Sequence, residues 1–447
     1  MRQIILLIIL ILSKEISSRT KEEWKSRSIY QILTDRFART STGNCNLYSY
    51  CGGNFKGLIE KLDYIKKMGF DAIWISPIVE NLEGSYHGYH TTNLYKLNSH
   101  FGTESDFKSL IAACHEKDIW VMVDVVANHM GLVGTDYSRI YPFNSSEHYH
   151  NVCQITDWDN NWQIENCRLS DLPDLNHENE WVKQTLLDWI HDLVEKYNID
   201  GIRIDTVREV PKWFWDEFRE YAGVFQIGEV FHGNVNIVGD YQNHLDSVFN
   251  YPLFYVIERA FCGSFRELEM YWFNDRPKFP MPEYAGVFLE NHDNPRFLYR
   301  CNNKGNYINA VVFIFIWEGI PIFYYGGEQF FSGGDEPNNR EPLWNNYDVN
   351  SELYIIIKKI NEFRKNIKIW NYDIIQRYAD QNFYAFTRGN VLACFTNIKN
   401  IERKITYHEF NEGDLLCNIL DENDCVSVSG GSIVINMKDY PKIYVKQ

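Results

Sequence analysis

Eight short apolar runs, separated by longer stretches, recur along the chain between about residue 27 and about residue 366. In chain order the runs are SIYQILTDRF, FDAIWISPI, WVMVDVVANH, IDGIRID, GVFQIGEV, LDSVFNY, YAGVFLENHD and GIPIFYYGGE. One of the longer stretches, residues 178–197, repeats apolar side chains at intervals of three and four, which is the period of an amphipathic helix. Because strands that alternate with helices pair in parallel, eight such units predict a (β/α)8 barrel.

Two segments do not follow this alternation. Residues 129–178 are irregular, rich in Asp, Asn and Trp, and too long for a barrel loop, so we expect a small inserted domain after the third strand. After about residue 367, short alternating or β-branched segments between polar turns predict a terminal antiparallel β domain. The expected organisation is a barrel over residues 19–128 and 179–366, the inserted domain over 129–178, and the β domain over 367–447.

The first 18 residues have the pattern of a secretory signal peptide. Arg2 precedes a nine-residue apolar run, Ile4 to Leu12, and small residues follow at Ser17 and Ser18. A membrane anchor is the alternative, but the run is well short of the ~20 apolar residues that a spanning helix needs. We therefore expect a secreted, extracellular protein with no membrane anchor after cleavage, and we expect it to be a monomer.

Charge argues against one class of partner. Acidic residues exceed basic residues, 60 against 44, and the net charge is −16. Lys and Arg do not gather into a long basic stripe anywhere along the sequence. Nucleic acid is therefore not an expected partner.

Ten cysteines in a secreted chain suggest disulfide bonds. Cys114 and Cys394 stand in apolar contexts, so we expect them to be buried free thiols. No C-x-x-C or Cys/His group has the spacing of a zinc site. Asn144 begins an N-glycosylation sequon, NSS. The expected pairs are Cys45 with Cys51, Cys153 with Cys167, Cys417 with Cys425, and, as a longer link, Cys262 with Cys301.

Polar residues collect at the ends of four of the expected strands, where barrels of this kind carry their active sites. Arg203 and Asp205 are two residues apart and so point to the same side of a strand, which taken alone fits a structural ion pair. Carboxylates that converge from several strands favour a catalytic cleft instead. The residues are Asp124, Asn128 and His129 on the third strand, Arg203 and Asp205 on the fourth, Glu229 on the fifth, and Glu290, His292 and Asp293 on the seventh.

Clustered carboxylates raise one another's pKa, so one can keep its proton while another, paired with Arg203, stays ionised. Retaining glycoside hydrolysis needs a protonated donor and an ionised nucleophile on either side of a bond, with carboxyl groups ~5 to 5.5 Å apart. The alternative is a metal-binding carboxylate cluster of a hydrolase that acts on another kind of ester.

Four motifs, VDVVANHMG, DGIRIDTV, IGEV and ENHDNPR, occur in that order. With them the chain resembles the α-amylase family, in particular its secreted fungal, Taka-amylase-like type, from YQILTDRF at residue 30 to about residue 366 and more weakly afterwards. The resemblance implies a TIM barrel with an inserted domain after the third strand and a C-terminal antiparallel β-sandwich.

The resemblance also implies site residues. Asp205 would be the nucleophile, Glu229 the general acid and base, and Asp293 the carboxylate that holds sugar hydroxyls and stabilises the transition state. Tyr89 would stack on a sugar, and Trp158 would form an aromatic wall. The implied sugar-binding residues are Gln31, His87, Tyr89, His90, His129, Trp158, Arg203, Arg208, Gly233, His292 and Arg340.

A structural Ca²⁺ is implied in the same way. Its ligands would be the side chains of Asn128 and Asp174 and the backbone carbonyls of Glu165 and Glu209. Oxygen ligands alone suit calcium, which is a hard cation.

Three features depart from the fungal pattern. His90 stands in place of a Trp, Glu336 in place of an Asp, and the pair Arg208 and Glu209 in place of Lys-His. All three concern the surface that binds substrate rather than the reacting carboxylates.

The leading hypothesis is a secreted, calcium-dependent, endo-acting α-amylase. It would hydrolyse α-1,4-glucosidic bonds of an α-glucan polysaccharide or oligosaccharide, starch or glycogen, with retention. A related α-glucosidase or α-glucan transglycosylase is the alternative, since the same three carboxylates serve all of these enzymes. A non-catalytic binding or transport subunit would usually show lost carboxylates and a membrane anchor, and the sequence has neither feature.

Overall fold

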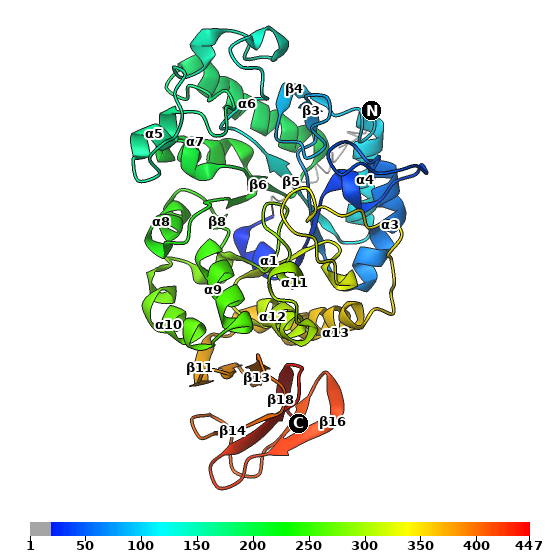
Figure 1. Cartoon of the computed structure of the whole chain (residues 1–447), viewed down its shortest axis with the longest axis vertical. Coiled ribbons are helices and arrows are strands. Elements are labelled where there is room, and N and C mark those ends of the chain that lie inside the picture. The colour runs from blue at the N-terminus through cyan, green and yellow to red at the C-terminus, as the bar shows by residue number, and fades with distance from the viewer. Residues whose placement is uncertain (1–18) are drawn as a thin grey trace, which may run out of the picture.

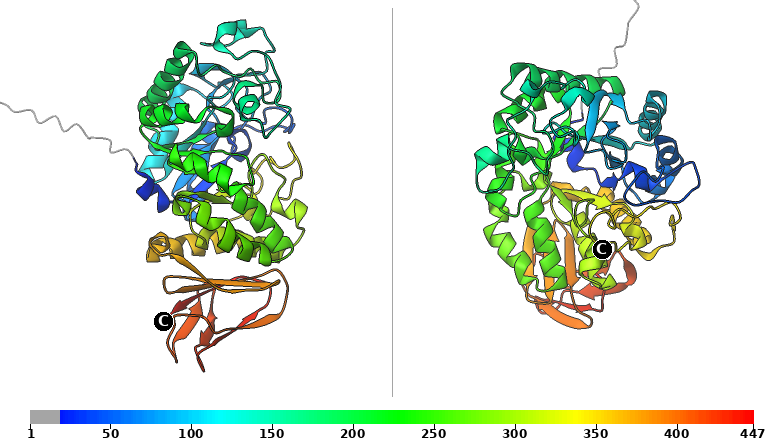
Figure 2. Two further views of the ribbon diagram at one scale, coloured as in Figure 1. Left: turned by 90° about the vertical axis from the view of Figure 1, so that its left-hand side faces the viewer. Right: turned by 45° about the horizontal axis from the view of Figure 1, so that its top comes forward.

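The computed structural model describes residues 19–447 (Figure 1). The expected signal peptide, residues 1–18, lies outside the described residues. Within residues 19–447, no helix has the length and apolarity needed to cross a membrane. The barrel lies in the middle of the molecule, with the segment after its third strand at one end and the C-terminal β region at the other (Figure 2).

A closed sheet of parallel strands forms the centre. Each strand lies within one of the eight predicted runs, and neighbours pair in parallel in the order β8-β7-β6-β5-β2-β1-β10-β9. The sheet closes where Phe249 forms a parallel bridge with Gly286, whose carbonyl accepts a hydrogen bond of 2.9 Å from the Asn250 N–H. The predicted barrel is confirmed. Its strands are β1 (Ile29–Ile32), β2 (Ala72–Ile75), β5 (Trp120–Val125), β6 (Gly201–Ile204), β7 (Phe225–Gly228), β8 (Ser247–Val248), β9 (Gly286–Phe288) and β10 (Ile320–Tyr324).

Apolar side chains pack the barrel interior so tightly that Gly286 has no room for a side chain. A Cβ there would lie 2.6 Å from Ile227 Cδ1 and 2.8 Å from Ile322 Cδ1. Trp24 closes the amino end of the barrel, where its ring stacks on Phe225, the first residue of β7, with the ring centroids 5.1 Å apart. The carboxyl ends of the strands therefore remain for a binding site.

Helices surround the barrel (Figure 1). Asn179 caps the start of α6, since its side chain accepts hydrogen bonds from the N–H groups of Trp181 and Val182, and the helix ends before Asn198, which is in the left-handed conformation. The helices are α1 (Lys21–Lys25), α2 (Thr34–Phe37), α3 (Phe55–Lys67), α4 (Glu104–Glu116), α6 (Glu180–Tyr197), α7 (Lys212–Ala222), α8 (Val235–Asp240), α9 (Tyr251–Cys262), α10 (Arg266–Asn274), α11 (Phe297–Arg300), α12 (Lys304–Ile316) and α13 (Glu352–Ile367).

The segment between β5 and α6 consists of loops and short helical turns. A hairpin that the sequence pattern did not indicate lies beside it: the Leu94 N–H donates to the Tyr141 carbonyl at 3.1 Å, and the Tyr141 N–H donates to the Thr92 carbonyl at 2.8 Å. The hairpin strands β3 and β4 are antiparallel. The elements are β3 (Val79–Asn81), β4 (Thr91–Leu97), η1 (Tyr137–Arg139), η2 (Ser146–His148) and α5 (Asn161–Asn166).

The C-terminal region is antiparallel, as predicted. Its larger sheet has the order β11-β12-β13-β18-β15-β16, and β14 pairs with β17. Both sheets contribute to one core, which includes Leu392 from the larger sheet and Ile405 and Ile435 from the smaller, so the region is a two-layer sandwich. The strands are β11 (Ile374–Ala379), β12 (Phe383–Arg388), β13 (Val391–Thr396), β14 (Ile401–Ile405), β15 (Leu415–Asn418), β16 (Asp421–Ser427), β17 (Ile433–Met437) and β18 (Lys442–Lys446).

The cysteine predictions are confirmed. Cys114 and Cys394 are buried and free. The bonded pairs are Cys45 with Cys51, Cys153 with Cys167, Cys262 with Cys301, and Cys417 with Cys425.

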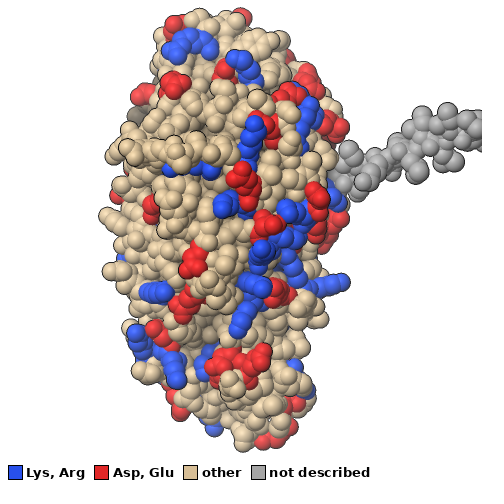
Figure 3. All heavy atoms as spheres, turned by 90° about the vertical axis from the view of Figure 1, so that its right-hand side faces the viewer, with Lys and Arg blue, Asp and Glu red and all other residues tan. Residues whose placement is uncertain are grey.

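Acidic and basic side chains are interspersed over the face shown in Figure 3.

Candidate active site

A cleft of about 830 Å³ opens at the carboxyl ends of the barrel strands. Asp205 and Glu229 line it because they directly follow the last residues of β6 and β7. The predicted residues that do not form part of its wall are Gln31, Arg203, Gly233, His292, Asn128, Glu165 and Asp174. The predicted residues that do are His87, Tyr89, His90, His129, Trp158, Asp205, Arg208, Glu209, Glu229, Asp293 and Arg340.

Arg203 holds three carboxyl groups from three neighbouring strands or strand ends. Its Nη1–H donates to Asp205 Oδ1 at 2.6 Å and to Asp124 Oδ1 at 3.0 Å, and its Nη2 lies 2.9 Å from Glu229 Oε2. Only 1% of the Arg203 side chain is exposed, so these charge-assisted contacts are shielded from water. The ion pair that the alternation of β6 predicts is thus one part of a larger cluster.

Glu229 has the surroundings of a proton donor. Burial raises its pKa well above the usual value; the Arg203 guanidinium opposes this shift, and the charges of Asp205 and Asp293 add to it. Burial also raises the pKa of Asp124, to about 7, again against the effect of Arg203. A carboxyl group with a raised pKa keeps its proton near neutral pH. Of these two groups only Glu229 lines the cleft, so it is the one that can protonate a ligand.

His292 lies behind Tyr89 and is oriented by Gln31. The Gln31 amide nitrogen is 2.9 Å from His292 Nδ1, and Tyr89 Oη is 2.6 Å from His292 Nε2. When the amide donates to Nδ1, the imidazole proton is on Nε2 and is donated to Tyr89, whose hydroxyl donates in turn to Asp124 Oδ2 at 2.8 Å. Gln31, implied as a sugar contact, therefore lies behind the wall and fixes the tautomer of His292.

Arg340 supports Asp293 at the cleft. Its Nε–H donates to the His292 carbonyl at 2.9 Å, its Nη2 lies 3.4 Å from Asp293 Oδ1, and its Nη1 bonds Glu336. Burial raises the pKa of Asp293, and the guanidinium groups of Arg340 and Arg203 oppose that shift. Asp293 is thus the third carboxyl group of the cleft, held by a cation of its own.

Aromatic side chains form another part of the wall. Trp158 is 47% exposed, and its carbonyl accepts a hydrogen bond of 2.7 Å from Arg208 Nη2. Phe231, 49% exposed, also lines the cleft, as does His232, the neighbour of the predicted Gly233. The sequence analysis missed Phe231, although an aromatic residue two positions after Glu229 on a strand end was a usable signal.

One predicted strand-end carboxylate points elsewhere. Glu290 is 3% exposed, and its Oε1 accepts a hydrogen bond of 2.8 Å from the Phe297 N–H. Its Oε2 accepts one of 3.1 Å from Tyr307 and lies 3.5 Å from Arg296 Nη1. Glu290 therefore belongs to the packed residues behind the cleft.

Oxygen atoms converge on Asn128 beside the cleft. One end of its amide lies 3.1 Å from the Glu209 carbonyl oxygen and 3.2 Å from Asp174 Oδ1. The other end lies 3.1 Å from His129 Nδ1. Glu165 is in α5, which packs against η3 (Val207–Glu209), so its backbone is close to the same region. Residues 19–447 contain no cluster of three His, Cys, Asp or Glu side chains suited to a metal, and this set includes only one such side chain, Asp174.

The tautomer of His129 decides which end of the Asn128 amide faces these oxygens. His129 Nε2 is 3.2 Å from the Tyr89 carbonyl oxygen, which can only accept, so Nε2 carries the proton. His129 Nδ1 is then an acceptor, and the Asn128 NH₂ group must donate to it. With this tautomer the Asn128 oxygen faces the oxygens of Glu209 and Asp174, an arrangement that a bound cation would stabilise. The residues present therefore fit a hard, oxygen-binding cation.

Comparisons with known proteins find related sequences and structures. Residues 31–371 match the family model described as alpha amylase, catalytic domain. An alpha-amylase of Saccharomycopsis fibuligera is 39% identical over 443 residues, which cover 92% of this chain and 89% of that protein. Alpha-amylase 1 of Schizosaccharomyces pombe is 39% identical over 465 residues, covering 96% of this chain and 74% of the relative. The structure of an alpha-amylase from Malbranchea cinnamomea superimposes with a TM-score of 0.91 at 37% identity, covering 96% of this chain and 97% of that one.

Proposed function

Because the chain belongs to the alpha-amylase family, we propose that it is an endo-acting α-amylase that hydrolyses α-1,4-glucosidic bonds of starch, glycogen and maltooligosaccharides with retention. The observation that carries this proposal is the Arg203 cluster. It sets a buried carboxyl group with a raised pKa, Glu229, beside a carboxylate, Asp205, in a cleft large enough for several sugar units.

We assign the first chemical step to Asp205 and Glu229. The Asp205 carboxylate attacks the anomeric carbon, and the bond from that carbon to the glycosidic oxygen breaks while Glu229 gives its proton to the leaving oxygen. In the second step, Glu229 takes a proton from water, and the water oxygen displaces Asp205 from the sugar. Two displacements at one carbon give net retention.

Other cleft residues would bind and orient the sugar. Asp293, held by Arg340, is placed to accept hydrogen bonds from sugar hydroxyls and to stabilise the positive charge of the transition state. Tyr89 presents a ring for stacking, and its orientation is fixed by His292. Trp158 and Phe231 offer apolar surface to the faces of further glucose units.

We further propose that the family's calcium ion is held by the Asn128 and Asp174 side chains and by the carbonyls of Glu165 and Glu209. When bound, the ion would place a positive charge among these converging oxygens and join the inserted segment to the barrel. Asn128 would then keep its NH₂ group on His129, so the imidazole keeps its Nε2 proton. Support comes from the orientation of the Asn128 amide described above.

Location and domain limits remain proposals as well. The four disulfide bonds favour an oxidising, extracellular location. The change of pattern after β5 and after α13 supports limits for the inserted domain near residues 129 and 178 and for the β domain near residue 367. The expected monomeric state and glycosylation of Asn144 stay predictions.

Incubation with soluble starch tests the proposed function. Iodine colour and reducing ends are followed together, because internal cleavage removes colour while few ends have formed. Colour that persists while reducing ends accumulate would indicate an exo-acting α-glucosidase. Loss of colour with almost no new reducing ends would indicate a transglycosylase.

A further inference from the structure

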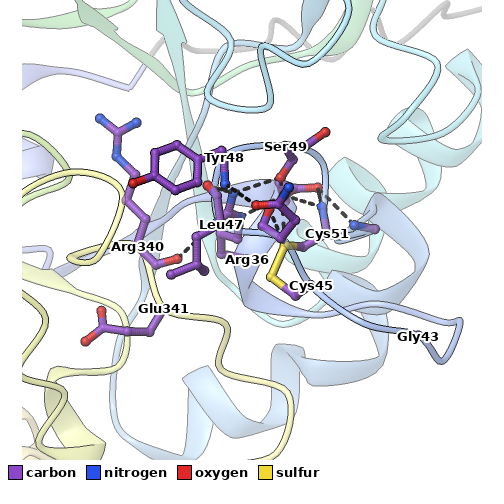
Figure 4. The surroundings of a disulfide bond; sticks show 12 residues. Arg36, Gly43, Cys45, Leu47, Tyr48, Ser49, Cys51, Arg340 and Glu341 are labelled. Atoms are coloured by element: carbon purple, nitrogen blue, oxygen red, sulfur yellow. Dashed lines mark hydrogen bonds and ion pairs between the residues drawn. A yellow bond between two sulfur atoms is a disulfide. The ribbon is translucent and has the colours of Figure 1, made fainter.

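Arg36 is a buried arginine near the cleft that none of the roles above uses. Its side chain has no exposed surface, and it does not line the cleft. Its Nε–H donates to Asp35 Oδ2 at 2.8 Å and its Nη1–H to the Arg340 carbonyl at 3.0 Å. Nη2 donates to the carbonyls of Leu47, at 2.8 Å, and Ser49, at 3.0 Å. Figure 4 shows these bonds joining segments that are far apart in the sequence.

The two loop carbonyls belong to a segment closed by the disulfide between Cys45 and Cys51 (Figure 4). Asp35 holds the end of the same segment, because its carboxylate accepts hydrogen bonds from the N–H groups of Cys51 at 2.8 Å and Gly52 at 3.1 Å. The Asp35–Arg36 ion pair therefore binds both donors and acceptors of the loop. A planar guanidinium can do this because its donors point in fixed, different directions.

The opposite side of Arg36 fixes Arg340 in two ways. The Arg340 carbonyl accepts directly from Arg36 Nη1. In addition, the Arg36 guanidinium lies 3.8 Å from the centre of the Tyr86 ring, and the Tyr86 hydroxyl accepts from Arg340 Nη1 at 3.3 Å. Arg36 thus holds the backbone of Arg340 directly and its side chain through Tyr86. Arg340 in turn lies 3.4 Å from Asp293.

We propose that Arg36 is a positioning residue for catalysis, which with the Cys45–Cys51 loop holds Arg340 against Asp293. This inference rests on the proposed function, since that function gives Asp293 a role in the transition state. Arg36 acts only through Arg340 and does not touch substrate. A lysine at position 36 keeps the charge but has no planar fork, so it cannot hold the loop and the Arg340 carbonyl together. Small displacements of a group that contacts the reacting sugar reduce rate strongly.

A purely structural role is the competing explanation, and Arg364 provides the matched control. Its side chain is also fully buried, and it donates to backbone carbonyls, those of Lys25 at 3.0 Å and Phe315 at 3.4 Å. It does not line the cleft. Replacement of either arginine by lysine removes buried hydrogen bonds and lowers thermal stability. Only the change at Arg36 should alter catalysis.

The experiment compares Arg36→Lys with Arg364→Lys in the full chain. We measure Tm, kcat and KM on a defined maltooligosaccharide, and the pH dependence of kcat. Wild-type cleavage of starch is measured first, so absence of that activity would refute the proposed function independently of Arg36. We expect Arg36→Lys to lower kcat about tenfold with a smaller change in KM, consistent with a small misplacement of a catalytic group. Arg364→Lys should lower Tm alone.

The acid side of the pH profile gives a second readout. As Arg340 moves away, the pKa of Asp293 rises, so the acid limb of kcat moves to higher pH in Arg36→Lys and stays in place in Arg364→Lys. An acid limb that does not move would overturn the proposal, whatever happens to kcat. The titratable and charged groups around Asp293 are Arg340, Arg203, His292, Glu229, Tyr89 and Tyr251.

The loop disulfide provides a variant that leaves Arg36 in place if Arg36→Lys does not fold. Replacement of Cys45 and Cys51 by Ser should shift the acid limb in the same direction and by a smaller amount. The matched control replaces Cys417 and Cys425, which close a loop of similar length in the C-terminal sandwich. Equal pH profiles for the two double variants would refute a link between the loop and Asp293.

Discussion

Two polar clusters lie side by side at the carboxyl end of the barrel, and they balance charge differently. Around Arg203, three carboxyl groups share a cation that the protein itself supplies. Around Asn128, the amide oxygen faces the Glu209 carbonyl and Asp174 Oδ1, while Asp174 Oδ2 lies 2.7 Å from His150 Nδ1. The first cluster is complete as the chain folds. We propose that a cation from solution completes the second.

This difference separates chemistry from stability. Removing a group from the Arg203 cluster should abolish turnover and leave the fold unchanged, because the remaining charges still have partners. Removing the proposed cation from the Asn128 cluster should weaken the fold and leave the reacting groups unchanged, because the converging oxygens of Asn128, Glu209 and Asp174 then lose their shared partner. The predictions below perturb one cluster at a time, except the last, which tests whether the two clusters are coupled.

The largest effect is expected for Asp205→Asn. An amide cannot form the covalent ester with the sugar, so turnover should fall by several orders of magnitude. Tm in calcium, and its decrease on chelation, should match those of the wild type, since the Asn128 cluster is untouched. Turnover within tenfold of the wild type would disprove the assignment of Asp205 as nucleophile.

A smaller loss is expected for Glu229→Gln. Loss of a general acid costs about 10²–10⁴-fold in rate. The loss should be much smaller on an aryl maltooligoside whose phenol leaves without protonation. In the wild type, the acid form of Glu229 disappears as pH rises through its raised pKa, so activity on starch falls on the alkaline side. An equal loss on both substrates would argue that Glu229 is not the proton donor.

The barrel could be predicted from sequence because buried parallel strands appear in a sequence as short apolar runs. β5, for example, is buried at every position, and so is β6 despite Arg203. The β3–β4 hairpin could not be predicted in this way. β4 has only two fully buried residues, Thr91 and Leu94, and no regular alternation, so its residues resemble a loop. β4 also exchanges backbone hydrogen bonds with Tyr141, about fifty positions away, a contact that no local pattern predicts.

The site was partly predictable for the same reason. Asp205 and Glu229 directly follow strand ends, so topology alone brings them together. Which way a side chain faces is harder to infer, as Glu290 and Gln31 show: one turns into the packing around Phe297, and the other lies behind His292. The cation ligands came only from the resemblance, since two of them are backbone carbonyls that leave no trace in residue type.

The third effect concerns calcium. Chelation should lower Tm by several degrees, because an ion that binds only the folded chain at about 100 times its Kd contributes about 2.7 kcal/mol. Asp174→Asn should show a Tm in calcium near that of the chelated wild type. Restoring calcium should restore Tm in the wild type and in Asp205→Asn. Equal Tm values with and without chelator in the wild type would remove the proposed ion.

The smallest effect on function is expected at the disulfide between Cys153 and Cys167, which is in the segment between β5 and α6. The loop that it closes carries Trp158 of the cleft wall and Glu165, and it buries little apolar surface, with Ile164 the one buried residue of α5. The cross-link could contribute about 3 kcal/mol by restricting the unfolded chain. In the folded chain, the Arg168 N–H still donates to the Cys153 carbonyl at 2.9 Å, which limits how far the loop can move.

Replacement of both cysteines by Ser should therefore weaken calcium and maltooligosaccharide binding together, by a few-fold each, because Glu165 and Trp158 move as one loop. Isothermal titration calorimetry measures both affinities, with the Asp205→Asn background preventing turnover. The alkaline limb of the pH profile, measured without that background change, should stay in place since Arg203 and Glu229 are untouched. Replacement of Cys417 and Cys425 should change neither affinity. If only one of the two affinities falls, the loop does not couple the clusters, and they are independent in this respect too.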